Sequence, residues 1–244
     1  MTNKKFDIIL TIILSIILVA VFVLVGFWGY DLIQKTSLQS NANHAVDEFN
    51  KLLEEAKRDR ENNNQNGARN DSGSENANPN PNPDSQEGEG QSDETSGEYY
   101  GDDYYYGSGI SYQDNGFNVV GTIEIPKLDL RYPVYDVATI SSMEHSVGII
   151  HGPGLNKPGN TVIMGHNYKN GTLFSDNKYL SVGDVIYITD TYGQTLQYNI
   201  YNVYTTSTSD FDYAIRETNG QKEITLASCT DDSSSRLIIW ARAE

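Results

Sequence analysis

A run of 23 residues without a charged side chain most constrains how this chain can fold. It extends from Ile8 to Tyr30. As a helix it would span about 35 Å, because each residue adds about 1.5 Å, and a bilayer core is about 30 Å thick. A cleaved signal peptide is the main alternative, but its apolar core is normally about 7–15 residues long. The longer run, which ends with the interfacial aromatics Trp28 and Tyr30, favours an uncleaved transmembrane anchor over residues 8–30.

Basic residues indicate the orientation of this anchor. Lys4 and Lys5 precede the run. Because basic flanks tend to stay in the cytoplasm, residues 1–7 are predicted to be a cytoplasmic tail, and everything after Tyr30 is predicted to lie outside the cell. Lys35 on the far side weakens this bias only slightly. We therefore expect a single-pass cell-membrane protein with an extracellular C-terminal domain.

Two segments of different composition follow the anchor. Residues 31–61 are predicted to form a helical juxtamembrane stalk, because an apolar stripe recurs every three or four positions: Val46, Phe49, Leu52, Leu53 and Ala56. Residues 62–116 are poor in aliphatic side chains, and residues 70–116 carry eleven acidic and no basic side chains. Such a composition buries too little apolar surface to offset chain entropy, so residues 62–116 are predicted to be a disordered acidic linker that acts as a tether.

Tyrosines crowd the end of this linker. They are Tyr99, Tyr100, Tyr104, Tyr105, Tyr106 and Tyr112. Solvated side chains in an acidic tract are one interpretation. The other is a segment that docks on the following domain, since tyrosine offers contact area at low entropic cost. The sequence leaves both open.

Residues 117–244 have the pattern of one all-β domain. Their 128 residues are enough for a folded core. Short runs rich in Val, Ile, Thr and Tyr are separated by turn residues, at a spacing that predicts a closed or nearly closed β-barrel. The formal net charge of −16 resides mainly in the linker. Because the chain has no basic stripe, a nucleic-acid partner is not expected.

Cys229 is the only cysteine of the chain, so an intrachain disulfide is impossible. One interpretation is a small buried hydrophobe. The other is a nucleophile. Arg236 begins the next expected strand, and the six intervening residues allow a hairpin in which directly opposite Cβ atoms lie about 5 Å apart. A guanidinium at that place would favour the thiolate and stabilise an oxyanion.

His166 ends an expected strand 63 residues before Cys229. A histidine can protonate a leaving amine and later deprotonate an incoming one. The other histidines, His44, His145 and His151, are expected to be solvated or structural.

Three motifs, in this order along the chain, resemble those of bacterial sortases. Residues 123–128 (Ile-Glu-Ile-Pro-Lys-Leu) are similar to the strand that opens the sortase catalytic domain. Residues 161–167 (Thr-Val-Ile-Met-Gly-His-Asn) are similar to the region of the sortase histidine. Residues 225–229 (Thr-Leu-Ala-Ser-Cys), followed by Arg236, resemble the sortase Thr-Leu-x-Thr-Cys segment and its arginine. The resemblance covers about residues 119–242, and a class B-like or D-like subclass stays open.

The resemblance implies an all-β fold, a closed eight-stranded sortase barrel with short helices, and a transpeptidation. Cys229 would attack the Thr–Gly carbonyl of a Leu-Pro-x-Thr-Gly-like sorting signal on a surface protein and form a thioacyl enzyme. An amine of a peptidoglycan precursor or of a pilin lysine would resolve it. His166 would transfer protons, and Arg236 would stabilise the oxyanion. Ala227 and Ser228 would contact the substrate, although Ser228 stands where threonine is usual.

Other classes of protein give different expectations. A non-catalytic, membrane-tethered surface β-domain (an adhesin or a degenerate sortase) would have a buried, unreactive Cys229. L,D-Transpeptidases have Ser-x-Gly-Cys-Arg-like sites, which differ from the Ser-Cys-Thr of residues 228–230. In papain-like proteases the cysteine precedes the histidine, which is the reverse of the order here.

No cofactor is expected. Some sortases bind calcium in the loop before the cysteine strand, which here carries Asp210, Asp212 and Glu217. Their spacing is not regular for calcium ligands and favours a solvated acidic loop.

Overall fold

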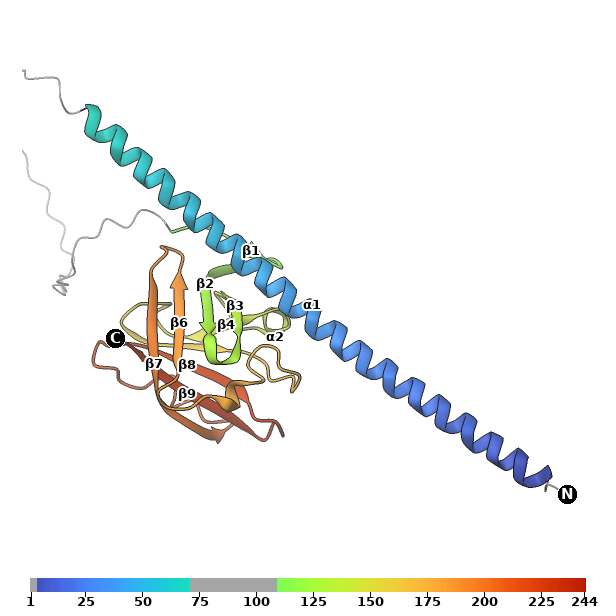
Figure 1. Cartoon of the computed structure of the whole chain (residues 1–244). Coiled ribbons are helices and arrows are strands. Elements are labelled where there is room, and N and C mark those ends of the chain that lie inside the picture. Colours follow the sequence, from blue (N-terminus) through green and yellow to red (C-terminus); the bar gives the residue numbers. More distant parts are fainter. Residues whose placement is uncertain (1–3, 71–108) are drawn as a thin grey trace, which may run out of the picture.

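The computed structural model describes residues 4–70 and 109–244. Nine strands form one sheet in the order β1-β2-β3-β4-β5-β8-β9-β7-β6, and a further pairing of β2 with β6 closes eight of them into a barrel (Figure 1). The strands are β1 (Gln113–Asp114), β2 (Phe117–Ile125), β3 (Leu130–Tyr135), β4 (Val147–His151), β5 (Gly159–Met164), β6 (Val185–Asp190), β7 (Thr195–Ser207), β8 (Lys222–Cys229) and β9 (Ser235–Ala243). The pairs β3–β4 and β5–β8 are parallel, and the other pairs are antiparallel. The predicted closed eight-stranded barrel is confirmed.

Three short helices lie in the connections between strands. They are the 3-10 helices η1 (Pro126–Leu128) and η2 (Asn177–Tyr179) and the α-helix α2 (Ile140–Met143). Thr139 caps α2, because its hydroxyl accepts a hydrogen bond from the Ser142 amide while the Ser142 hydroxyl accepts one from the Thr139 amide. This reciprocal cap satisfies two amides that the helix itself leaves free.

The contact that closes the barrel depends on a glycine. Gly121 in β2 pairs with Asp190 in β6. A Cβ atom at Gly121 would lie 2.3 Å from the Thr189 carbonyl oxygen and 2.5 Å from Leu155 Cδ1, so any side chain would push β2 and β6 apart. The pairing of β2 with β3 shifts between Val119 and Gly121, and such a bulge bends a strand as closure requires.

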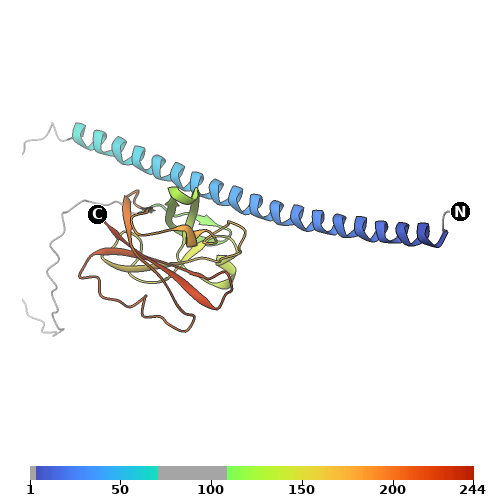
Figure 2. The ribbon, with the colours of Figure 1, turned by 60° about the horizontal axis from the view of Figure 1, so that its bottom comes forward.

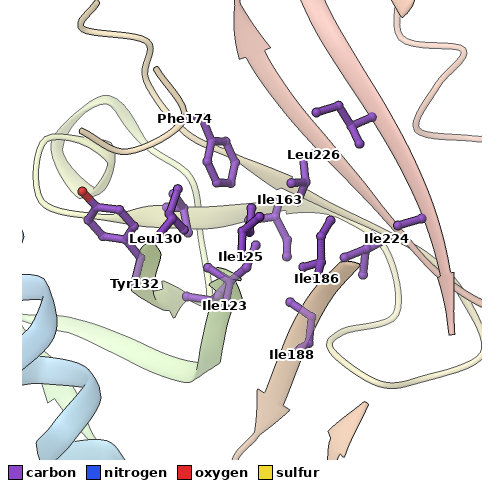
Figure 3. Close-up of a cluster of buried hydrophobic side chains, with 14 of the residues drawn as sticks. Ile123, Ile125, Leu130, Tyr132, Ile163, Phe174, Ile186, Ile188, Ile224 and Leu226 are labelled. Carbon is purple, nitrogen blue, oxygen red and sulfur yellow. The ribbon is translucent and has the colours of Figure 1, made fainter. Parts of the chain in front are cut away.

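Aliphatic side chains from alternate positions of the strands fill the barrel. In β6, Ile186 and Ile188 are fully buried, whereas Val185 and Tyr187 are partly exposed. In Figure 3 the labelled side chains of β2, β5, β6 and β8 meet in one cluster. Full burial of each large aliphatic side chain contributes about 1.5–3 kcal/mol to folding. This cluster holds the strands that carry the site described below.

Helix α1 (Lys4–Asn70) is continuous, lies along one side of the barrel and extends far beyond it at its N-terminal end (Figures 1 and 2). Its large apolar side chains between Ile8 and Ile33 are exposed. Of the helices in the described ranges, it is the one that is long and apolar enough to cross a membrane. The exposed apolar part contains residues 8–30, the predicted anchor.

The stripe of the predicted stalk packs on the barrel. Phe49 is fully buried and Leu53 is nearly so, in a cluster with Val119 and Tyr135 of the barrel. Ala42 belongs to the main core. Polar contacts flank this apolar seam: Gln39 Oε1 accepts a hydrogen bond from Tyr132 Oη at 3.0 Å, and Asp47 forms an ion pair with Arg131 at 3.3 Å. The segment is therefore part of the folded domain.

The two ends of the predicted linker, residues 62–116, also differ from the sequence-based expectation. Helix α1 continues to Asn70, since a formed helix gains a hydrogen bond for each residue that it adds. At the other end, Ile110 and Tyr112 pack against the cluster around Phe49, and the rings of Tyr112 and Phe49 lie 6.5 Å apart. Tyr112 therefore docks on the domain. The other five tyrosines lie outside the described residues.

Substitution of Phe49 tests the packing of α1 on the barrel. We expect Phe49→Ala to lower the free energy of unfolding by about 3–5 kcal/mol, because it leaves a cavity between the helix and the barrel. His44 is an exposed position of the same helix segment, so His44→Ala is the matched control and should be neutral. Thermal unfolding of the detergent-solubilised chain measures both. Equal melting temperatures for Phe49→Ala and the parent would contradict the docked helix.

Candidate active site

Cys229 and Arg236 face each other across one hairpin. They are register partners at the end of β8 and the start of β9. The connecting turn is closed by a hydrogen bond from the Thr230 amide to the Ser235 carbonyl at 2.9 Å, and Ser233 provides a left-handed residue with φ of 60°. Cys229 is partly exposed and its thiol is free. The structure thus brings a free thiol beside a guanidinium, as the sequence predicts.

His166 lies beside the same end of β8. Strand β5 runs parallel to β8, with Met164 paired to Ala227. One residue further, the Gly165 amide donates to the Ala227 carbonyl at 3.2 Å, and Asn167 Nδ2 donates to the Cys229 carbonyl at 3.0 Å. Because neighbouring strands lie about 4.8 Å apart, this register sets His166 next to Cys229.

The loop that follows His166 is pinned at its base. The Phe174 amide donates to the His166 carbonyl at 3.1 Å, and Asn167 forms an isolated bridge with Leu173. The rings of His166 and Tyr168 lie 5.1 Å apart. Residues 166–174 therefore form a closed loop that holds the histidine in place.

Alternation along the strands puts Cys229 and Arg236 on one face. Ala227, two residues before Cys229, packs with Met164 and Ile238 in a cluster separate from the main core. Residues two apart in a strand share a face, so Cys229 and its register partner Arg236 project to the side of this cluster. Contact of Arg236 Nη1 with the Met164 sulfur at 4.0 Å agrees with that placement.

The guanidinium of Arg236 is held by several neighbours. Its Nε donates to the Thr208 carbonyl at 3.4 Å, and its centre lies 5.9 Å from the Phe211 ring. Tyr213 is buried beneath this region, and its hydroxyl finds no hydrogen-bond partner among the described residues. Burial raises the pKa of Tyr213, while the charge of Arg236 opposes that rise. The face thus combines an apolar floor with the Arg236 cation, an arrangement suited to an extended peptide that carries a polarised carbonyl.

Asp231 connects the histidine loop to the turn after Cys229. It accepts hydrogen bonds from Asn167 Nδ2 at 3.0 Å and from Lys178 Nζ at 2.8 Å. The bonds to Lys178 and Asn167 hold the pKa of Asp231 below its ordinary value. A cavity of about 380 Å³ reaches Cys229 from this side. Sequence reasoning did not select Asn167 or Asp231 as site residues, although their places beside His166 and Cys229 are the signal that could have found them.

The two residues predicted to contact the substrate, Ala227 and Ser228, lie on opposite faces of β8. Ala227 lies on the face of Cys229, as part of the cluster floor. Ser228 is 2% exposed and alternates with Ala227 and Cys229, so it points to the side of Leu226 in the main core. Both side chains are buried, Ala227 with 0% of its surface exposed, so only the face of β8 on which each lies distinguishes them. Contact of either residue with substrate stays a prediction.

The second arginine of β9, Arg242, and the histidine His145 lie away from Cys229. Arg242 pairs with Glu223 at the other end of the same hairpin, six residues from Arg236. His145 packs near Phe117, with ring centroids 6.3 Å apart. No group of three or more His, Cys, Asp or Glu side chains within residues 4–70 and 109–244 could hold a metal ion. Asp210 instead accepts hydrogen bonds from the Thr206 hydroxyl and the Asp212 amide.

Glu223 is the centre of a buried ionic network that supports the hairpin. Its side chain is fully buried, and it accepts hydrogen bonds from Tyr201 at 2.7 Å, from Arg242 at 2.7 Å and from Arg216. Burial alone would raise the pKa of Glu223, but these donors outweigh it and lower the pKa below the ordinary value of 4.5. The stabilisation is therefore fully present above pH 4.5 and is lost as the pH falls through the lower folded-state pKa.

Replacement of Glu223 by glutamine should destabilise the domain at neutral pH. Loss of one partner of a buried ion pair costs about 3–5 kcal/mol, and we expect the lower end because Arg242 is half-exposed. The difference between the parent and Glu223→Gln should shrink as the pH falls below 4.5. Urea unfolding at pH 7 and at acid pH measures it. A difference that grows on acidification would contradict the ionic network.

Comparisons with known proteins identify the family of this chain. Residues 123–244 match the family model described as a sortase domain. The chain is 32% identical to Sortase A of Bacillus anthracis over 127 residues, a match that covers 50% of this chain and 58% of that protein. Among solved structures, Sortase A from Corynebacterium diphtheriae is 29% identical with a TM-score of 0.48, over 52% of this chain and 61% of that one. The Sortase D5 transpeptidase of Clostridium perfringens is 28% identical with a TM-score of 0.49, over 54% of this chain and 81% of that one. The chain thus spans less than two thirds of the length of the two Sortase A relatives.

Proposed function

Since the chain belongs to the sortase family, we propose that it is a cell-surface cysteine transpeptidase. It cleaves a C-terminal, Leu-Pro-x-Thr-Gly-like sorting signal between threonine and glycine and transfers the protein to an amine of the cell wall or of a pilin. The observation that supports this function best is the register pair of Cys229 and Arg236, with His166 set beside it by the parallel strand β5.

In the first half of the reaction, the Cys229 thiolate attacks the threonine carbonyl. A tetrahedral intermediate forms, and its oxyanion is stabilised by the Arg236 guanidinium, which lies across the hairpin from the sulfur. His166 gives a proton to the glycine nitrogen as the carbon–nitrogen bond breaks. The products are a thioester on Cys229 and a free amino-terminal glycine peptide.

In the second half, an amine attacks the thioester carbonyl. His166 takes the proton that the attacking nitrogen loses, and Arg236 again stabilises the oxyanion. Collapse of this second intermediate breaks the carbon–sulfur bond, forms the amide and returns the Cys229 thiolate. A peptidoglycan precursor and a pilin lysine are the two acceptors consistent with an amine nucleophile.

Membrane anchoring is part of the proposal. The exposed apolar residues of α1 between Ile8 and Ile33 form a membrane span, and the lysines before it keep the N-terminus in the cytoplasm. The barrel then lies outside the cell, where sorting-signal proteins and cell-wall amines are available.

Thiol labelling tests the proposal directly. We expect a methanethiosulfonate to modify Cys229 rapidly, and a sorting-signal peptide to protect it and leave a thioacyl adduct that mass spectrometry detects. A non-catalytic surface β-domain predicts an inert thiol and no adduct. That result would remove the transpeptidase proposal.

A further inference from the structure

Helix α1 connects the proposed membrane span to the barrel without a break. The span ends at Tyr30, and Leu38 is already packed against the main core. Leu38 follows Tyr30 by eight positions, which rise about 12 Å as helix. Neither glycine nor proline occurs from Asp31 to Leu53, so no residue that typically kinks a helix separates the span from the docked stripe.

The histidine loop is the part of the barrel beside the end of the span. Asn170 lines one hollow together with Trp28, Leu32 and Lys35 of α1. Tyr168 shares a second hollow with Leu38 and other residues of the same helix segment. A Cβ atom at Gly171 would lie 2.6 Å from Lys35 Nζ. The tip of the loop is therefore level with the aromatic end of the span.

The turn between β6 and β7 marks the opposite end of the barrel along α1. A Cβ atom at Gly193 would lie 3.3 Å from Lys57 Cε and 3.6 Å from Leu53 Cδ2. Lys57 follows Lys35 by 22 positions in the same helix, and 22 residues rise about 33 Å. With a typical helix tilt of about 20°, the two ends of the barrel differ in height by about 31 Å.

The chemistry of the loop tip fits a lipid headgroup layer. Trp28 and Tyr30 are residues that favour the membrane–water interface. Asn170 presents a polar side chain at that level, and Lys35 adds a cation near anionic headgroups. Along the sequence, residues 71–108 follow α1. They therefore do not lie between the membrane span and the part of α1 that docks on the barrel.

We propose that α1 fixes the barrel on the membrane surface, with the tip of the histidine loop (Lys169–Gly171) in the headgroup layer of the outer leaflet. This inference rests on the proposed membrane anchoring. It assigns lipid headgroups as the partner of the loop, and it gives the docked part of α1 the tethering role that the sequence suggests for residues 62–116. The active-site face is then held close to the membrane, where a sorting signal or an acceptor attached to the membrane would meet it.

Depth-dependent fluorescence quenching tests the arrangement. Cys229→Ala removes the only native thiol, and Asn170→Cys or Tyr192→Cys then provides one labelling site at either end of the barrel. The full-length labelled chains are reconstituted into vesicles of phosphatidylcholine and phosphatidylglycerol that contain a headgroup-spin-labelled lipid. We expect strong quenching of the label at residue 170 and little at residue 192. Equal quenching at the two sites, or none at residue 170, would overturn the proposal.

A second pair of variants tests whether the helix itself sets the height. A flexible Gly-Ser insertion between Thr36 and Ser37 should abolish quenching at residue 170, whereas the same insertion after Asn82 should leave it unchanged. Quenching that survives the first insertion would overturn the role of α1. Vesicle flotation separates this inference from the proposed anchoring. Chains that do not float contradict the anchor itself, while chains that float with an unquenched label at residue 170 contradict only the fixed height.

Discussion

Cys229→Ala is expected to abolish both cleavage of a sorting-signal peptide and transfer to an amine. The chain has no other cysteine, so no other thiol can form the acyl intermediate. The fold should be retained, because Cys229 is only partly buried at a strand end and alanine keeps its Cβ atom. Mass spectrometry of products from a quenched-fluorescent sorting peptide, with and without an added amine, measures both half-reactions.

His166→Ala is the informative companion of this variant. The thiol remains, so slow modification by an alkylating reagent should persist, while turnover should fall by several orders of magnitude because no group protonates the leaving amine. His145→Ala is the matched control, since His145 lies against Phe117, outside the assigned catalytic residues. Cleavage at the parent rate in Cys229→Ala would exclude the acyl-enzyme mechanism, whatever the histidine variants do.

The sequence predicts the strands and the hairpin that pairs Cys229 with Arg236 because both depend on local patterns. Alternating strands show which residues share a face, and a six-residue connection between Cys229 and Arg236 leaves a hairpin as the simplest link. The approach of His166 is not local. It follows from the parallel pairing of β5 with β8, which joins segments more than sixty residues apart. Only the motif resemblance supplied that information before the structure.

The docking of α1 shows where sequence reasoning stops. An apolar stripe indicates that a helix buries one face, but it does not say against what. Phe49 and Leu53 pack against Val119 and Tyr135. In the sequence these two pairs are separated by an acidic segment whose composition predicts a free tether. Ser228 is a different case, because its inward direction follows from alternation with Cys229 and only the motif analogy pointed to substrate contact.

Glu223 illustrates a further limit. Nothing in the sequence shows that Arg216, Arg242 and Tyr201 converge on one buried carboxylate. The network also accounts for Arg242, the second arginine of β9. It occupies the far end of the hairpin and is engaged with Glu223, so Arg236 is the arginine at the site.

Arg236→Lys should separate two roles of the positive charge. Lysine keeps the charge, so a long-range effect on the thiolate population should largely survive, and the rate of Cys229 alkylation should change little. The planar guanidinium of Arg236 is held between the Met164 sulfur and the Thr208 carbonyl. In the proposed mechanism it binds an oxyanion, and a flexible ammonium does not reproduce that geometry. Loss of a well-placed oxyanion donor costs about 10²–10³ in rate, and we expect a decrease of at least that order in turnover of the sorting peptide.

Arg242→Lys provides the matched control for this substitution. It makes the same chemical change six residues along the same strand, where the guanidinium contacts Glu223 instead of the site. It should lower stability while leaving turnover near that of the parent. If Arg236→Lys turned over the peptide at a near-normal rate, the oxyanion role would be lost, because preserved charge alone would then suffice. If both turnover and alkylation fell in parallel, Arg236 would act on the thiolate and not on the oxyanion, since the two rates share only the ionisation of Cys229.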